Sequence, residues 1–137
     1  MGKILALDVG GTRIGVASAD TQLRFANPLT TLLNDEAIWE TLAALVQEHD
    51  VQTVVVGLPR GLEGQETAQT SICRDFAKTL SERLKIAVAL QDEATTSLKA
   101  EAELKARGKP YEKSDIDALA ATYILEDYLH DEYKETA

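Results

Sequence analysis

The stretch from Ile4 to Ser18 constrains the fold of this chain more than any other. Two apolar runs, at 4–7 and 14–18, predict a buried strand and its hairpin partner. Between them, Gly10 and Gly11 predict a tight turn, because glycine takes positive φ cheaply and lets a ligand come close to the backbone. Asp8 then ends a central strand with nothing bulky in front of it, where a metal ion or a phosphate could bind. The alternative is that Asp8 only stabilises its own turn.

The length and composition predict one globular domain over residues 1–137. The one cysteine, Cys73, falls among apolar helix positions, so we expect it in the core, and an intrachain disulfide is excluded. No apolar run approaches the ~20 residues of a membrane helix, and the chain starts directly with a strand rather than a signal peptide. These features predict a cytoplasmic protein without a membrane partner.

The formal net charge of −9 argues against a nucleic-acid partner, because phosphate binding depends on lysine and arginine. The charge is uneven, however: residues 111–137 alone carry −6, which leaves −3 for the rest. The balance therefore weakens a nucleic-acid function without excluding it, and acidic clusters are also typical of divalent-cation sites.

Seven further elements follow the hairpin. In order, the pattern predicts a strand at 23–31, a helix capped by Asn34 and ending near His49, a strand at 53–57, a helix at 67–84, a strand at 86–90, a helix ending near Arg107 and a helix beginning at Ser114. Pro28 predicts that the 23–31 strand lies at a sheet edge. The β-branched run at 53–57 and the run at 86–90 both predict buried strands.

Carboxylates recur at the ends of these elements. Asp92 and Glu93 follow the 86–90 strand, although they could simply complement the dipole of the next helix, which Thr95 or Thr96 would cap. Asp117 shares a helical stripe with Ala121 and Ile124, which would turn it towards the sheet, but it also completes a capping box with Ser114.

Convergence of Asp8, Asp92 or Glu93, and Asp117 would be costly unless cations compensate the charge, so it implies a metal. Oxygen ligands without paired His or Cys favour Mg²⁺ or Mn²⁺. Two such ions about 4 Å apart can position a water for attack on a phosphodiester. This arrangement would be a nuclease site.

Basic side chains offer candidate contacts for a phosphate backbone. Arg60 lies in a loop rich in glycine at 57–64, and Lys113 closes a basic segment around Gly108 and Pro110. Each could equally be a solvated surface residue.

Four ordered motifs resemble the YqgF family, also called RuvX: Asp8 to Ala17, Val55 to Pro59 with Gly64, Asp92 to Thr96, and Asp117 to Leu125. The resemblance implies an α/β, RNase H-like fold with a mixed five-stranded sheet flanked by helices. It implies a metal-dependent nuclease with Mg²⁺ or Mn²⁺ held by Asp8, Glu93 and Asp117, and with Arg13, Arg60 and Lys113 near the backbone of a structured nucleic acid. The expected reaction is maturation of the 5′ end of 16S rRNA. Where the family usually has arginine, this chain has Ala94, which puts substrate affinity or activity in doubt.

Three alternatives stay open at this stage. The chain could act as a Holliday junction resolvase, which favours a homodimer, whereas trimming an RNA end needs only a monomer. It could be a non-catalytic nucleic-acid-binding module of the same fold. The Asp8 to Thr12 segment also resembles the phosphate-binding turn of sugar kinases, but those enzymes hold ATP between two domains and this chain has room for one.

Overall fold

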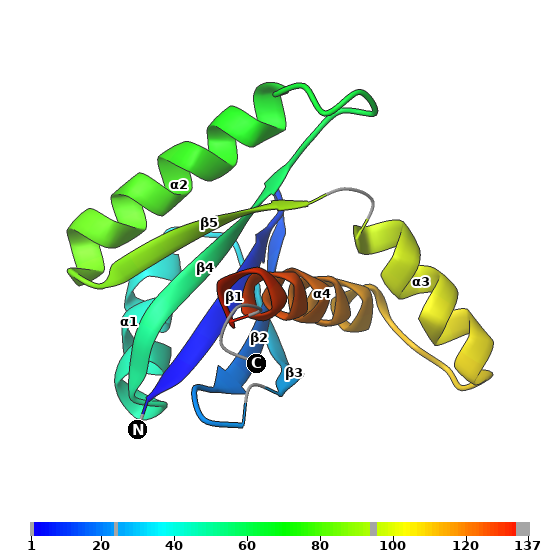
Figure 1. Ribbon diagram of the computed structural model, residues 1–137, viewed down its shortest axis with the longest axis horizontal. Helices are drawn as coiled ribbons and strands as arrows, with labels where there is room; N and C mark the ends of the chain where they lie inside the picture. The colour runs from blue at the N-terminus through cyan, green and yellow to red at the C-terminus, as the bar shows by residue number, and fades with distance from the viewer. Residues whose placement is uncertain (1, 24, 94–95, 134–137) are drawn as a thin grey trace.

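A mixed five-stranded sheet organises the chain (Figure 1), as seen in a computed structural model that describes residues 2–23, 25–93 and 96–133. The strands lie in the order β3-β2-β1-β4-β5; β1, β2 and β3 pair antiparallel, and β1, β4 and β5 pair parallel. The elements are β1 (Lys3–Val9), β2 (Arg13–Asp20), β3 (Ala26–Leu33), α1 (Ile38–Glu48), β4 (Val51–Pro59), α2 (Ala68–Leu84), β5 (Ala87–Glu93), α3 (Thr96–Arg107) and α4 (Lys113–Tyr133). Both the predicted order of elements and the mixed five-stranded sheet are confirmed.

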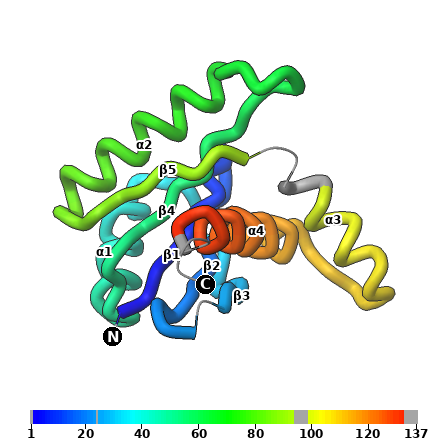
Figure 2. The backbone as a smooth tube through the Cα atoms, in the orientation of Figure 1, coloured from blue at the N-terminus to red at the C-terminus, as the bar shows by residue number. Residues whose placement is uncertain are grey.

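The two faces of the sheet are covered by different helices. On one face, α1 and α2 pack on a core of large aliphatic side chains that includes Leu5, Leu7 and Val56. On the other face, α4 packs on smaller side chains, among them Ala6 and Ala17. The tube in Figure 2 shows α3 apart from the sheet, and its buried residues belong to a third cluster shared with α4.

Glycine and alanine let α4 approach the sheet closely. A Cβ placed on Gly15 of β2 would lie 1.9 Å from the carbonyl oxygen of Asp117 in α4. A Cβ placed on Gly57 of β4 would lie 2.6 Å from Cδ1 of Ile124. Gly15 therefore requires glycine as α4 is placed here, because a Cβ would meet backbone atoms, whereas at Gly57 the end of the Ile124 side chain would have to move. The beginning of α4 lies over Gly15 of β2, and its middle lies over Gly57 of β4.

The edges of the sheet agree with the prediction on one side and differ on the other. β3 is an edge strand, as Pro28 predicts, and its register with β2 shifts between Val16 and Ala17. The expectation that 86–90 forms a buried strand was wrong, because β5 is the opposite edge and Leu90 is 43% exposed. Short apolar runs do not reveal strand order, which long-range pairing decides.

Two helix predictions also need correction. Asn34 does not cap α1, which begins at Ile38 and has no side-chain cap. Helix α2 does begin where predicted, since Thr67 caps it in a reciprocal capping box with Thr70. Ile72 of α2 is 55% exposed, although its helical spacing with Cys73, Phe76, Leu80 and Leu84 predicts that it faces the core.

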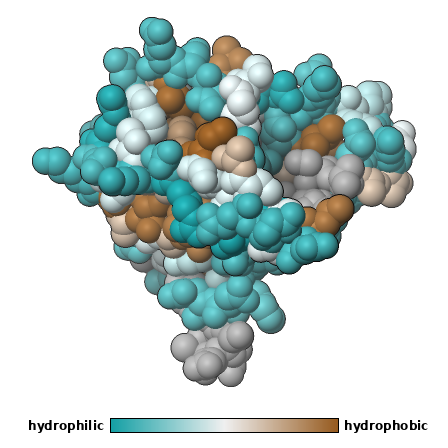
Figure 3. Space-filling view, turned by 90° about the horizontal axis from the view of Figure 1, so that it is seen from above, coloured by the Kyte–Doolittle hydropathy of each residue, from teal (hydrophilic) through white to brown (hydrophobic). Residues whose placement is uncertain are grey.

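The surface is mostly hydrophilic in the view of Figure 3, where hydrophobic residues occur in separate patches. Among the described residues, no helix combines the length and apolar character that crossing a membrane would require.

Candidate functional site

The β1–β2 hairpin places Asp8 on the face of the sheet that α4 covers. Ile4 and Ala6 pack in the α4 cluster, and Asp8 follows them at the same alternating position of β1. The turn is closed by a hydrogen bond from the Gly10 N–H to the carbonyl oxygen of Arg13, at 2.9 Å. The strand therefore directs the Asp8 carboxylate towards the beginning of α4.

Of the two turn glycines, Gly10 has a structural reason to be glycine and Gly11 has none, and neither has positive φ, contrary to the prediction. A Cβ on Gly10 would lie 2.8 Å from the Arg13 carbonyl oxygen, so this position needs a close backbone approach. Around Gly11 the space is open. Positive φ is found at Gly64 and Gly108 instead.

Two amide side chains support this turn from outside the hairpin. Asn34 donates from Nδ2 to the carbonyl oxygen of Gly10 at 2.8 Å, and Gln69 donates from Nε2 to that of Val9 at 3.1 Å. The sequence analysis missed both roles. Asn34 resembled a helix cap, and nothing in the local pattern distinguishes Gln69 from a surface residue of α2.

Strand alternation separates the two carboxylates at the end of β5. Ala89 packs in the α4 cluster and Val88 packs against the α1/α2 core, so Glu93 shares the face of Ala89, and Asp92 shares that of Val88. A Cβ on Gly57, which lies on the α4 face, would be 3.2 Å from Cδ of Glu93. Glu93 is therefore the β5 carboxylate on the same face of the sheet as Asp8, and its charge acts on Asp8.

Asp117 completes the cluster from α4. Its Oδ2 accepts a hydrogen bond from Arg13 Nε at 2.6 Å, across 104 positions of the chain. The capping-box alternative for Asp117 is wrong, because α4 begins at Lys113 and the backbone N–H of Glu112 donates to Asp115 Oδ2. Asp117 is thus turned to the sheet, as the helical stripe predicts.

Glu93 and Asp117 are the two carboxylates whose negative charges act on Asp8. Burial, together with these two charges, raises the pKa of Asp8 from its ordinary value of 3.8 to about 7. As the side chains stand, no group of three or more His, Cys, Asp or Glu within the described ranges is close enough to hold a metal ion. The carboxylates thus form a site of concentrated negative charge in which Arg13 already neutralises Asp117.

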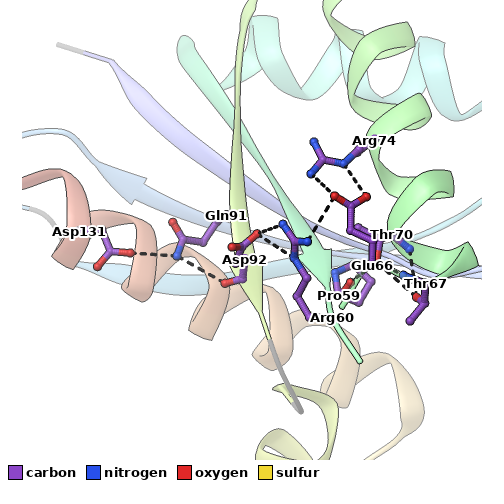
Figure 4. A network of polar contacts seen from close by, with 9 residues as sticks. All are labelled: Pro59, Arg60, Glu66, Thr67, Thr70, Arg74, Gln91, Asp92 and Asp131. Carbon is purple, nitrogen blue, oxygen red and sulfur yellow. Dashed lines mark hydrogen bonds and ion pairs between the residues drawn. The ribbon is translucent and has the colours of Figure 1, made fainter. Parts of the chain in front are cut away.

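On the other face of β5, the carboxylates are paired with guanidinium groups (Figure 4). Arg60 contacts Asp92 at 2.8 Å and Glu66 at 3.4 Å, and Arg74 contacts Glu66 at 2.8 Å. The backbone N–H of Arg60 also donates to the Glu93 carbonyl oxygen at 3.2 Å. Arg60 therefore joins the ends of β4 and β5.

The remaining predicted residues lie nearby or outside the described ranges. Lys113 is the exposed first residue of α4, four positions before Asp117. The departure at Ala94 and the predicted cap at Thr95 fall outside the described residues, as does the side chain of Thr96.

Cys73 lies below this site, within the core as predicted. It is 1% exposed, and its Sγ is 3.8 Å from the carbonyl oxygen of Val9, the residue after Asp8. Burial raises the pKa of the thiol to about 11.

Comparison with known proteins gives consistent relatives. A protein of Chloroflexus aurantiacus named "Putative pre-16S rRNA nuclease" is 46% identical over 130 residues, covering 92% of this chain and 85% of the relative. A protein of the same name from Sulfurihydrogenibium sp. is 37% identical, covering 94% of this chain and 90% of the relative.

Solved structures extend the likeness to the fold. RuvC of T. thermophilus in complex with a Holliday junction substrate superposes with a TM-score of 0.60 at 14% identity, covering 98% of this chain and 97% of that one. A second structure, of Thermus thermophilus RuvC, gives a TM-score of 0.57 at 14% identity, covering 96% of each chain. The RNase H-like fold expected from the motifs is thereby confirmed.

The sequence profile of RuvX, described as a Holliday junction resolvase, matches residues 2–131. This match spans all four motifs and almost the whole chain, whereas the sugar-kinase likeness rested on five residues. With relatives of 37–46% identity over more than nine-tenths of its length, this chain belongs to the RuvX (YqgF) family.

Proposed function

We propose that this protein is a metal-dependent nuclease that cleaves a phosphodiester bond in precursor 16S rRNA, with Asp8, Glu93 and Asp117 as its catalytic carboxylates. The observation that carries this proposal is the half-buried Asp8 carboxyl at the end of β1, whose pKa is raised to about 7 by burial and by the charges of Glu93 and Asp117. Carboxylates held together in this way destabilise the fold unless a bound ligand compensates their charge. The names of the 37–46% identical relatives supply the substrate class.

The donor set suits a hard divalent cation. Carboxylate oxygens are the preferred ligands of Mg²⁺ and Mn²⁺, and a cation would relieve the repulsion that raises the Asp8 pKa. Asp8 and Glu93 would hold the ion, and Asp117 would join them once it no longer pairs with Arg13. A bound ion of this kind polarises a phosphate and lowers the pKa of water.

The residues of the chain would then have separate tasks. Arg13, released from Asp117, would contact the phosphate backbone of the substrate through its planar donor group. Lys113 would add a second backbone contact from the beginning of α4. Arg60 would have to exchange Asp92 and Glu66 for a phosphate to do the same, so its first task is to hold the end of β5, where Glu93 lies.

Junction resolution is the second candidate, because the family is described as a Holliday junction resolvase. It would require a homodimer with two carboxylate clusters facing the two-fold related strands, whereas trimming of an RNA end needs only a monomer. Processing of precursor rRNA would place the protein in the cytoplasm.

The test is cleavage of a 16S precursor RNA and of a four-way DNA junction, each with Mg²⁺, Mn²⁺ or EDTA. Asp8→Asn keeps the size of the side chain and removes its charge, so it should abolish metal-dependent cutting. Cutting of the RNA supports rRNA processing, and preferential cutting of the junction supports the resolvase. If neither is cut while RNA still binds, the protein is a non-catalytic module of the same fold, and Ala94→Arg becomes the variant to test for restored cleavage.

A further inference from the structure

A cavity of about 290 Å³ lies beside the candidate site, between the edge strand β3, the end of α3 and the beginning of α4. Its apolar wall comes from Leu104, Ala118 and Leu119, all buried. Gly108, with φ of 71°, ends α3 and turns the chain back, so that Lys109 and Tyr111 also line the cavity.

The side chains at its rim combine an aromatic ring with cations. Tyr111 is half-buried and packs against the α3–α4 cluster while it lines the cavity. Arg107 lines it as well and pairs with Glu103 at 2.6 Å. Lys109 is exposed and forms no ion pair with the described residues. The Asp115 carboxylate also borders the cavity, where its Oδ2 accepts the Glu112 N–H.

A second, polar cavity of about 340 Å³ adjoins the first and extends it towards the carboxylates. The two share Pro28, Asp115 and Ala118, and the second is also lined by Thr30, Thr31 and Ser114. Thr31 pairs with Gly15 in the sheet, and Gly15 is the residue against which the Asp117 carbonyl packs. A nucleic-acid strand leaving the candidate site at Asp117 would therefore pass the hydroxyl-lined cavity and reach Tyr111.

We propose that this groove binds the single-stranded flank of the RNA substrate, with one unstacked base against Tyr111 and the adjoining phosphates on Lys109 and Arg107. Aromatic stacking with a positively charged border is how proteins hold single strands, and base pairing in a duplex would keep the base out of a cavity of this size. The hydroxyl groups of Thr30 and Ser114 would contact sugar and phosphate oxygens of the same strand, whereas Thr31 Oγ1 already donates to the Ser114 carbonyl oxygen at 2.7 Å. The inference rests on the proposed nuclease function and adds a preference for single-stranded RNA next to the cleaved bond.

The experiment measures binding of a fluorescent hexauridylate and of a blunt RNA duplex to the full chain in EDTA, at several salt concentrations. Tyr111→Leu, which keeps an apolar side chain, should weaken binding of the single strand about 5- to 150-fold, since stacking of one base is worth about 1–3 kcal/mol. Tyr111→Phe should restore it. Lys109→Gln should lower the salt dependence of binding by about one phosphate contact, and Lys78→Gln, an exposed lysine of α2, should leave it unchanged.

The outcomes separate this inference from the proposed function. Equal binding by wild type and Tyr111→Leu, or tighter binding of the duplex than of the single strand, would overturn the groove. If the precursor is cleaved with an unchanged KM by Tyr111→Leu, the nuclease stands and the groove fails. If hexauridylate binds through Tyr111 while no precursor is cleaved, the groove stands and the nuclease fails.

Discussion

Asp92 and Glu93 are neighbours in β5, yet their carboxylates belong to opposite environments. Asp92 turns to the α2 face, where Arg60 contacts it and Glu66, and Arg74 also contacts Glu66. Glu93 turns to the α4 face, where its charge contributes to raising the pKa of Asp8. The first group neutralises its charges within the protein, and the second concentrates charge of one sign.

This difference shows how to tell a structural ion network from a candidate active site. Exposed ion pairs contribute little to stability, but they fix the ends of β4 and β5 relative to each other. Half-buried carboxylates of like charge oppose folding when they are brought together, and Gly15 lets the beginning of α4, with Asp117, lie close to the sheet. The four predictions below test whether the two faces differ in this way.

The largest expected effect comes from replacing Glu93 and Asp92 in separate variants. Glu93→Gln should reduce metal-dependent cleavage about 10²- to 10³-fold, as removal of one charged or polar group from an active site does. Asp92→Asn is the matched control and should change the rate less than about threefold, because its side chain is 67% exposed on the other face. Single-turnover rates at saturating metal measure both; equal losses would mean that β5 alternation does not assign the catalytic carboxylate.

The next effect is on stability and depends on pH. Because the folded-state pKa of Asp8 is raised, its contribution to stability is full below its ordinary pKa of 3.8 and is lost as the pH rises to about 7. This rise corresponds to at most about 4 kcal/mol, and we expect about 2 kcal/mol because the side chain keeps some contact with water.

In EDTA, Asp8→Asn should therefore be more stable than wild type. Its advantage should grow between about pH 4 and about pH 7 and stay constant above that range. Urea unfolding at intervals of half a pH unit measures the difference. Mg²⁺ should stabilise wild type and not the variant at pH 8, and an advantage independent of pH would show that Asp8 is not held in a charge-concentrating site.

The close packing of α4 can be tested with two glycines of the same hairpin. Gly15→Ala should cost about 1–3 kcal/mol, because the new methyl group meets the Asp117 backbone and pushes α4 outward. Gly11→Ala has open space and an ordinary φ, so its stability should stay within about 0.5 kcal/mol of wild type. Thermal and urea unfolding compare them; equal stabilities would contradict the placement of α4.

The smallest effect distinguishes the two roles considered for Arg60. If Arg60 connects the strand ends, Arg60→Gln should lower the free energy of unfolding by about 0.2–1 kcal/mol. Its effect should then not add to that of Asp92→Asn in a double-mutant cycle. If Arg60 contacts the substrate, Arg60→Gln should instead weaken RNA binding and lower the salt dependence of that binding, while Asp92→Asn does neither. The same four proteins provide both measurements.

The sequence predicts the elements better than their neighbours in space. The apolar periods locate every strand and helix, and Asp8 is identified by its strand and turn. Strand alternation was sufficient in principle to prefer Glu93 over Asp92, once the end of β5 at Glu93 is known. The ion pair of Arg13 with Asp117 spans 104 positions, and no local pattern indicates it.

The errors have the same physical origin. Asn34 has the side chain of a helix cap, but the Gly10 carbonyl, 24 positions away, accepts its hydrogen bond. Ser114 and Asp117 have capping-box spacing, but α4 begins at Lys113, so the residue before it is Glu112 and the carboxylate that accepts its N–H is Asp115. Polar residues with several available partners are assigned by the tertiary structure.

The position of Cys73 gives the molecule an internal reporter. The thiol is the one cysteine of the chain, is 1% exposed and lies directly under the Val9 carbonyl. Since its raised pKa and burial prevent reaction with a maleimide in the closed state, labelling proceeds only when α2 and the end of β1 separate. The labelling rate therefore measures how often α2 separates from the end of β1 next to Asp8. Slower labelling on addition of Mg²⁺, in the absence of substrate, would show that the ion binds and makes this local opening less frequent.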